Sequence, residues 1–272
     1  MLGAVDPTVL KLLRCSHCGE SKVAYASSRL HCEACGAMFD DGGGYFDFVD
    51  ESAGSPTAAT LEQRLMESEL IARLYDRVWR PTFVRVFAGR GASKAAGGFT
   101  GEFFIHKHAL AVDERVGPWL DLSTGPGTFT RAIAAASPGA TVIGVDISRA
   151  MLEVAAKRGR GYSNIVLLRG DAHDIPLADE SMAGINNSGA LHVYDDAQRV
   201  FEEVLRVLRP GGLFVGSTFA TAKSRTGKIA ARLAGIRRFD PPELRAWLSR
   251  IGFADYEEIR LGAGIIFRCR KP

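Results

Sequence analysis

The 272 residues of this chain exceed one average domain, so we expect one large module and one small one. Apolar residues make up 46% and charged residues 24%, as in ordinary soluble globular proteins, and no apolar run reaches the ~18 residues that cross a bilayer. Because residues 1–14 also lack a cleavable signal pattern, we expect a cytoplasmic protein without a membrane partner, and the net charge of +3 is too small to indicate nucleic-acid binding by itself.

Two matched cysteine pairs stand near the N-terminus. Cys15 and Cys18 form one C-x-x-C knuckle, and Cys32 and Cys35 form a second, each followed by glycine. Four thiolates brought to the corners of a tetrahedron suit Zn²⁺, and because they fill its coordination shell we expect a structural zinc. Two disulfides are the alternative, which a cytoplasmic location disfavours. The fifth cysteine, Cys269, is expected to be a small buried apolar residue.

The knuckles belong to a small first domain. Glycines followed by alternating aromatics over residues 39–48 predict a turn and a short strand that closes a zinc ribbon. Residues 51–57, rich in Ser, Gly and Pro, are expected to be a linker. The domains expected are a zinc ribbon over residues 1–55, a helical lid or linker region over 56–116, and a cofactor-binding core over 117–272.

The middle region is expected to be mostly helical. Apolar spacing predicts a helix over residues 58–79, which Pro81 ends, and a second helix from Thr82. Residues 89–101, rich in Gly, Ala and Ser, predict a mobile loop, and residues 102–116 predict a further helix. Such helices either cover a ligand as a lid or pack against the core, and the sequence leaves both interpretations open.

Strands and helices alternate regularly from Gly117 onward. Strands are expected over residues 118–122, 141–146, 164–169, 182–187, 212–218, 254–261 and 264–270, and helices over 128–136, 148–157, 196–208 and 243–251. This alternation builds a mainly parallel sheet with helices on both faces, and two closing strands without a helix between them pair antiparallel. The fold class expected is therefore α/β: a Rossmann-like, seven-stranded, mostly parallel sheet with an antiparallel last strand, plus the small N-terminal zinc ribbon.

A glycine turn flanked by acidic residues follows the first of these strands. Gly125 and Gly127 let backbone N–H groups approach a ligand closely, and Asp146, which ends the next strand, can accept both hydroxyls of a ribose. A dinucleotide is disfavoured, because Thr130 replaces the third glycine of that fingerprint and Asp121 would repel a pyrophosphate. The turn instead favours S-adenosylmethionine, which carries an ammonium group and a sulfonium centre but no phosphate.

The successive motifs of the core appear in a characteristic order. They are Asp121-Leu-Ser-Thr-Gly125-Pro-Gly127, Gly144-Val-Asp146-Ile-Ser148, Gly170-Asp171-Ala172, Ile175-Pro176-Leu177 and Arg206-Val-Leu-Arg-Pro210-Gly211-Gly212. Over about residues 102–272 the chain thereby resembles the class I S-adenosylmethionine-dependent methyltransferases, with a core of the UbiE or methyltransferase-11 type. The resemblance implies an enzyme that transfers a methyl group.

The resemblance also implies which residues bind the cofactor. They are Asp121, Ser123, Thr124, Gly125, Gly127, Asp146, Ile147, Asp171, Ala172 and Asn187. The turn from Ser123 to Gly127 would line the methionyl part, although the family's usual glycine is Ser123 here, whose hydroxyl is able to bond the methionine carboxylate.

The other assigned residues would hold the adenosine and the reacting centre. Asp146 would hold the ribose, with Ile147 against adenine. Asp171 would accept the adenine amino group with the Ala172 amide nearby, or it would simply cap a turn or a helix. Asn187, at the end of the fourth strand, would face the sulfonium.

The end of the fourth strand bears on the chemistry. Residues 186–192 lack the Asn/Asp-Pro-Pro-aromatic pattern with which amino-directed nucleic-acid methyltransferases hold a base, and Ala183 and Gly184 stand where the family often has an aspartate. An oxygen acceptor benefits from a general base, and His192, with an unperturbed pKa of about 6.5, is the candidate catalytic residue. The alternative is a histidine that packs or caps the next helix.

Two subgroups of the family share a zinc ribbon ahead of this core. One is similar to ribosomal RNA guanine-N1 methyltransferases, and the other to plastid-type plant methyltransferases of poorly defined role. The second resembles this chain more closely, over residues 75–80, 190–192, 215–219 and 266–272. The first 55 residues hold four Lys and Arg against eight Asp and Glu, a net −4 that leaves +7 for the rest, so the ribbon is a poor phosphate-binding surface.

We therefore expect methyl transfer to a small-molecule acceptor, a hydroxyl or enol oxygen of a specialised, polyketide-like metabolite. Methylation of ribosomal RNA guanine is the alternative, because the basic residues between Lys223 and Arg238 could contact nucleic acid. A protein or quinone acceptor is also open, as is a non-enzymatic cofactor-binding scaffold with a zinc interaction module. The sequence leaves the oligomeric state open.

Overall fold

The computed structural model of the protein describes residues 6–26, 29–49, 72, 74, 75, 78, 80–82, 98–220 and 239–272. The helices expected over residues 58–79 and from Thr82, the loop expected over 89–101 and the basic stretch 223–238 lie wholly or largely outside these residues. Among the helices that are described, none combines the length and the apolar character needed to cross a membrane.

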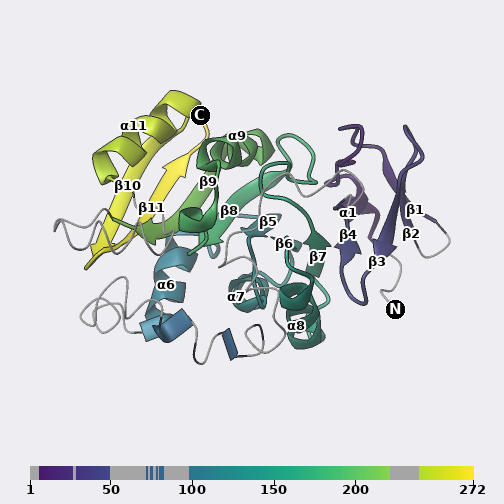
Figure 1. Ribbon diagram of the computed structural model, residues 1–272, viewed down its shortest axis with the longest axis horizontal. Coiled ribbons are helices and arrows are strands. Elements are labelled where there is room, and N and C mark those ends of the chain that lie inside the picture. The colour runs from purple at the N-terminus through teal and green to yellow at the C-terminus, as the bar shows by residue number, and fades with distance from the viewer. Residues whose placement is uncertain are drawn as a thin grey trace.

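Seven strands form the core sheet (Figure 1). They are β5 (Trp119–Leu122), β6 (Val142–Asp146), β7 (Ile165–Arg169), β8 (Met182–Ser188), β9 (Leu208–Phe219), β10 (Ala254–Leu261) and β11 (Gly264–Arg270). Their order is β7-β6-β5-β8-β9-β11-β10. Strands β5 to β9 are parallel, and β11 runs antiparallel to both of its neighbours. The predicted α/β sheet with an antiparallel last strand is thus confirmed.

The direction of winding changes between β5 and β8. The chain runs outward from β5 through β6 to β7 and then returns to build β8 and β9 on the other side. Ligands of open parallel sheets bind beyond the carboxyl ends of the strands at such a switch point. Gly125 follows β5, Asp146 ends β6 and Ser188 ends β8 at this same edge.

Helices cover both faces of the sheet. Those on one face are α6 (Gly98–Leu110), α7 (Thr128–Ala136) and α8 (Arg149–Gly159), and those on the other are α9 (Ala197–Val207) and α11 (Pro241–Ile251) (Figure 1). In α9, Val200, Val204 and Val207 recur at helical spacing and are fully buried. Asp196 caps this helix, accepting a hydrogen bond from the Arg199 N–H at 3.1 Å.

Two elements depart from their predicted bounds by more than two residues. Helix α6 begins at Gly98, inside the expected loop, and ends at Leu110, because Ala111 takes a left-handed φ of 54° that the helix cannot continue. Strand β9 begins earlier than expected, at Leu208, because that residue already pairs with Met182 of β8.

The ribbon continues the core sheet at its β7 edge (Figure 1). It contains α1 (Pro7–Leu10), β1 (Val23–Ala26), β2 (Arg29–Cys32), β3 (Met38–Asp41) and β4 (Phe46–Asp47). Its strands pair antiparallel with one another, whereas β4 pairs parallel with β7. One buried cluster joins Leu13, Leu30 and Phe39 of the ribbon to Leu168 and Leu177 of the core. The ribbon therefore shares its hydrophobic core with the larger module.

Candidate cofactor site and metal centre

The glycine turn joins the ends of β5 and β6. The Thr124 N–H donates to the Val145 carbonyl at 2.9 Å. Gly125 and Gly127 have φ angles of 54° and 73°, a region that costs any other residue about 1–2 kcal/mol. A Cβ on Gly127 would lie 2.9 Å from the Ala155 Cβ of α8. Glycine is therefore required for the turn to pack this closely.

Replacing Gly127 with alanine is expected to lower the free energy of unfolding by about 2 kcal/mol, because backbone strain adds to the contact with Ala155. Urea denaturation measures the change. Gly139→Ala is the matched control, since a Cβ there meets no heavy atom within 4 Å and should change stability by less than about 0.5 kcal/mol. Equal effects of the two substitutions would contradict the steric argument.

Ser123 is held in a costly conformation by a tyrosine that sequence reasoning missed. Its φ is 57°, and its Oγ lies 2.7 Å from the Tyr194 hydroxyl. The same hydroxyl accepts a hydrogen bond from Asn187 Nδ2 at 2.7 Å. Burial raises the pKa of Tyr194, which keeps the phenol neutral. Tyr194 thereby ties the turn after β5 to the end of β8.

Asp121 organises the turn from inside. Its side chain accepts hydrogen bonds from Thr124 Oγ1 at 2.9 Å, Thr130 Oγ1 at 2.6 Å and Asn186 Nδ2 at 2.7 Å. The residue is 2% exposed, and this burial raises the pKa of its carboxyl group. Thr130, noted in the sequence only as the missing third glycine, is thus a partner of the acid that shapes the turn.

Asp146 lies between the glycine turn and α8. Its Oδ2 accepts from the Gly125 N–H at 2.7 Å and its Oδ1 from the Ser148 N–H at 2.9 Å. Burial raises the pKa of Asp146 to about 6, although these N–H donors oppose the shift. The adjacent Ile147 side chain is 46% exposed, as expected of an apolar surface on which a base could stack.

This raised pKa predicts a pH dependence of cofactor affinity. The sequence predicts that ribose hydroxyls donate to the ionised carboxylate of Asp146, so affinity should be full well above pH 6 and should fall as Asp146 takes up a proton below it. We expect about tenfold weaker binding of S-adenosylmethionine at pH 5 than at pH 8, because only about a tenth of the groups are ionised there. Calorimetry across this range measures the effect, and a flat profile would show that Asp146 does not carry the interaction.

Asp171 follows β7 and is paired with a histidine that the sequence did not single out. Asp171 Oδ1 accepts from the His173 N–H at 2.9 Å and lies 2.7 Å from His173 Nδ1. Although burial opposes the change, hydrogen bonding from His173 lowers the pKa of Asp171, and the same bond raises the pKa of His173. Asp195 lies 3.0 Å from His173 Nε2. Asp171 thus forms the turn that the sequence offered as its alternative role, with Ala172 buried beside it.

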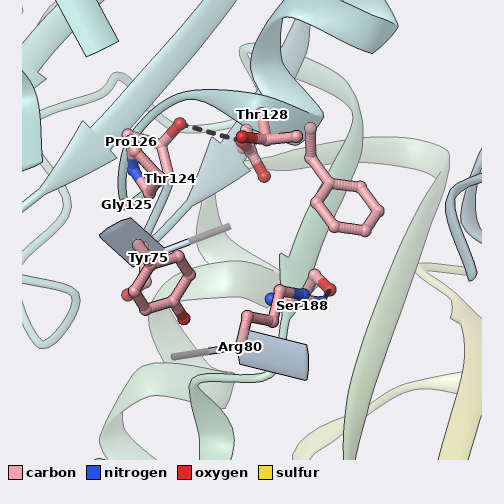
Figure 2. A pocket seen from close by; sticks show the side chains of 10 residues that line it. Tyr75, Arg80, Thr124, Gly125, Pro126, Thr128 and Ser188 are labelled. Atoms are coloured by element: carbon pink, nitrogen blue, oxygen red, sulfur yellow. Dashed lines mark hydrogen bonds between the residues drawn. The ribbon is translucent and has the colours of Figure 1, made fainter. Parts of the chain in front are cut away.

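A pocket opens beside the glycine turn (Figure 2). Its lining residues are Tyr75, Arg80, Asp121, Ser123, Thr124, Gly125, Pro126, Thr128, Phe129 and Ser188. Four of the residues predicted to bind the cofactor are among them. Figure 2 shows the turn on one side of the pocket and Tyr75, Arg80 and Ser188 across from it.

A buried ion pair forms the far side of this pocket. Arg80, 7% exposed, donates from Nη2 to Glu102 Oε1 and to Ser188 Oγ, both at 2.7 Å. Its guanidinium carbon lies 5.3 Å from the ring centroid of Phe129. Although burial opposes it, the charge of Arg80 lowers the pKa of Glu102, so the pair stays ionised and its charges balance. Sequence reasoning gave neither residue a role.

Seven of the eleven predicted site residues lie outside the pocket lining: Gly127, Asp146, Ile147, Asp171, Ala172, Asn187 and His192. Asn187 is fully buried and also donates from Nδ2 to the Leu122 carbonyl at 3.1 Å. His192, in the short helix η3 (Leu191–Val193), is 3% exposed, and its ring centroid lies 5.2 Å from that of Phe219. The packing role that the sequence left open for His192 is thus present, and its role as a base stays a prediction.

The four paired cysteines form one cluster. Their sulfur atoms all lie within 4.8 Å of one another, with Cys15 to Cys35 at 3.7 Å and Cys18 to Cys32 at 3.6 Å. A tetrahedron with Zn–S bonds of about 2.3 Å has S···S edges of about 3.8 Å, so the cluster fits structural zinc. The distances exceed the ~2.05 Å of a disulfide bond, and all five cysteines, the buried Cys269 included, are free thiols.

Comparisons with known proteins agree with this geometry. A family model described as a methyltransferase domain matches residues 120–216. The demethylmenaquinone methyltransferase of Clavibacter sepedonicus is 31% identical over an alignment of 172 positions that covers 54% of this chain and 69% of that protein. An uncharacterised chloroplastic methyltransferase of Arabidopsis thaliana is 27% identical over an alignment of 280 positions that covers 96% of this chain and 75% of that protein.

The fold agrees as well. A solved S-adenosylmethionine-dependent methyltransferase of Thermotoga maritima matches with a TM-score of 0.53 at 20% identity, covering 76% of this chain and all of that one. The strand order, the glycine turn and these relatives together show that the chain belongs to the class I S-adenosylmethionine-dependent methyltransferases.

Proposed function

We propose that this enzyme transfers the methyl group of S-adenosylmethionine to a hydroxyl or enol oxygen of a small organic acceptor, a specialised metabolite of polyketide type. The observation that carries the proposal is the pocket beside the glycine turn (Figure 2). The methionyl part of the cofactor would lie along the turn, with Asp146 and Ile147 at its ribose and adenine and Asp171 with Ala172 at the adenine edge. The acceptor would then meet the methyl group at the side formed by Tyr75, Arg80 and Ser188.

The chemistry of that side suits a planar acceptor with a polar oxygen. Tyr75 and Phe129 offer aromatic surface, and Ser188 offers a hydroxyl at the carboxyl end of β8. The charge of Arg80 is balanced by that of Glu102, so this ion pair does not favour an acceptor that carries a phosphate. Methyl transfer is an in-line displacement at an activated carbon, and alignment of acceptor and donor supplies much of its acceleration.

The charge of the ribbon argues against an RNA acceptor. RNA docking depends on neutralising phosphates with Lys and Arg, whereas the first 55 residues carry a net charge of −4. The relative from Clavibacter sepedonicus is named for demethylmenaquinone, and that name supports a small organic acceptor here too.

We retain His192 as the proposed base for an oxygen acceptor. It follows β8 by four residues, next to the end of the strand that carries Ser188. His192→Asn should then lower kcat, while the affinity for S-adenosylmethionine stays within twofold. A packing role alone would lower the stability of the protein and leave kcat unchanged.

The acceptor class is tested by supplying candidate acceptors with S-adenosylmethionine and measuring S-adenosylhomocysteine release and product mass. A panel of phenolic and enolic polyketides, a demethylated quinone and ribosomal RNA lacking the guanine methyl group separates the alternatives. A mass gain of one methyl on a hydroxyl or enol oxygen supports the proposal. Turnover confined to the RNA or to a quinone carbon would overturn it.

A further inference from the structure

The ribbon reaches the core at the edge that carries the adenosine side of the cofactor site. Phe46 and Asp47 of β4 pair with Leu168 and Arg169, the last residues of β7. The Phe48 N–H then donates to the Arg169 carbonyl at 2.9 Å. Because the loops that bind ligands begin where parallel strands end, the pairing of β4 with the end of β7 places the ribbon beside the site.

Asp47, a carboxylate of the ribbon, lies at this junction. Asp47, with a side chain 14% exposed, accepts from Arg169 Nη1 at 3.0 Å and lies 3.2 Å from Arg149 Nη2. Arg169 Nε in turn donates to the Ile147 carbonyl at 3.0 Å. Arg149 is the first residue of α8. Arg169 therefore contacts the segment from Asp146 to Arg149 near its start, and Arg149 connects the end of this segment to Asp47.

The knuckle of the ribbon is connected to the same region. Arg14, the residue before Cys15, pairs with Asp174 at 2.6 Å, and its N–H donates to the Pro176 carbonyl at 3.2 Å. These contacts brace the loop after β7, in which Asp171 and Ala172 lie.

The knuckle formed by Cys15 and Cys18 also contacts Phe48, the residue that follows β4. The Ser16 hydroxyl, between Cys15 and Cys18, donates to the Phe48 carbonyl at 2.6 Å. The position of Asp47 is therefore set by the folded ribbon and not only by the two-residue strand that carries it.

We propose that Asp47 is a positioning residue of the cofactor site, and that the ribbon acts as a built-in support for adenosine binding. Through Arg169 and Arg149 it places Asp146 and Ile147, without itself touching the cofactor. This inference rests on the proposed assignment of those two residues to the ribose and adenine. Removing the charge of Asp47 should leave Asp146 and Ile147 less firmly positioned. It should not change the glycine turn from Ser123 to Gly127.

The test compares two substitutions of the same kind in the ribbon. Asp47→Asn should weaken binding of S-adenosylmethionine by about tenfold, measured by calorimetry on zinc-loaded protein, and should weaken binding of 5′-methylthioadenosine by the same factor. Asp40→Asn is the matched control, because the Asp40 side chain is 75% exposed and lies as far as 3.9 Å from its partner Arg29. Its affinities should equal those of the unaltered protein.

A second pair of measurements separates positioning from folding. Arg169→Gln removes one of the two arginine partners of Asp47 while leaving the ribbon unaltered, and it should also weaken binding. The loss of affinity in the Asp47→Asn/Arg169→Gln double variant should be smaller than the sum of the two single losses, since both substitutions remove the Asp47–Arg169 ion pair. Additive losses, or full affinity in folded Asp47→Asn protein, would overturn the inference. Failure of the unaltered protein to bind S-adenosylmethionine would instead overturn the cofactor assignment.

Discussion

Asp146→Asn should weaken S-adenosylmethionine binding by at least about 100-fold. Two ribose hydroxyls would donate to the carboxylate, and hydrogen bonds to charged groups contribute about 1.5–3 kcal/mol each. A combined loss of about 3 kcal/mol corresponds to roughly a 150-fold rise in Kd. The amide would also turn an N–H₂ group toward one of the two backbone donors, Gly125 or Ser148, that now meet carboxylate oxygens.

Calorimetry with S-adenosylmethionine measures this loss directly. Asp113→Asn is the matched control, since that carboxylate is 64% exposed and pairs with Lys107 away from the pocket lining. The control should bind within twofold of the unaltered protein. If folded Asp146→Asn protein retained the affinity of the control, the ribose would have to be held elsewhere.

Loss of the metal should have the second large effect. Cys32→Ser, or treatment with a strong chelator, is expected to remove about one zinc per chain and to unfold the ribbon. Structural zinc supplies about 10–16 kcal/mol in isolated zinc-finger peptides, and a loss of even about 3 kcal/mol lowers the thermal midpoint of a chain this size by roughly 6–12 °C. Leu13, Leu30 and Phe39 would leave the core that they share with Leu168, so the larger module is destabilised too.

Metal content by mass spectrometry and proteolytic cleavage within the ribbon report this change separately. Cys269→Ser is the matched control, because this buried thiol lies in β11 and outside the cysteine cluster. It should lose some stability from burial of a hydroxyl but keep its zinc. A Cys32→Ser protein that kept both its zinc and its protease resistance would contradict the four-thiolate site.

Periodicity along the chain was enough to predict most of the core. The expected helix over residues 128–136 coincides with α7, and the expected strands over 254–261 and 264–270 coincide with β10 and β11. Helix α7 and strand β11 carry clear apolar patterns, and β10 alternates half-buried with exposed residues over most of its length, so local information sufficed. The predicted end of helix α6 was wrong because the helix stops at the left-handed conformation of Ala111, which no local sequence pattern predicts.

The candidate site was predicted in part. Sequence motifs brought out Asp146, Ser123 and the glycines because these residues adjoin a strand end. Tyr194 lies 71 residues from its partner Ser123, and Arg80 lies 108 residues from Ser188. Neither contact leaves a local signal, because each depends on which segments the sheet order brings together.

By itself the sequence determined the alternation of strands and helices, the two cysteine knuckles, the glycine turn and the kind of nucleoside that such a turn accepts. Each of these depends on neighbouring residues: the spacing of apolar side chains, the conformational freedom of glycine, and pairs of cysteines with two residues between them. Only the tertiary structure decided that β4 continues the core sheet beside β7, that Asp47 of the ribbon holds Arg169, and that Asp121 is buried among its donors. The physical reason is that hydrogen bonds and ion pairs between distant segments form only once packing has placed their partners within about 3 Å.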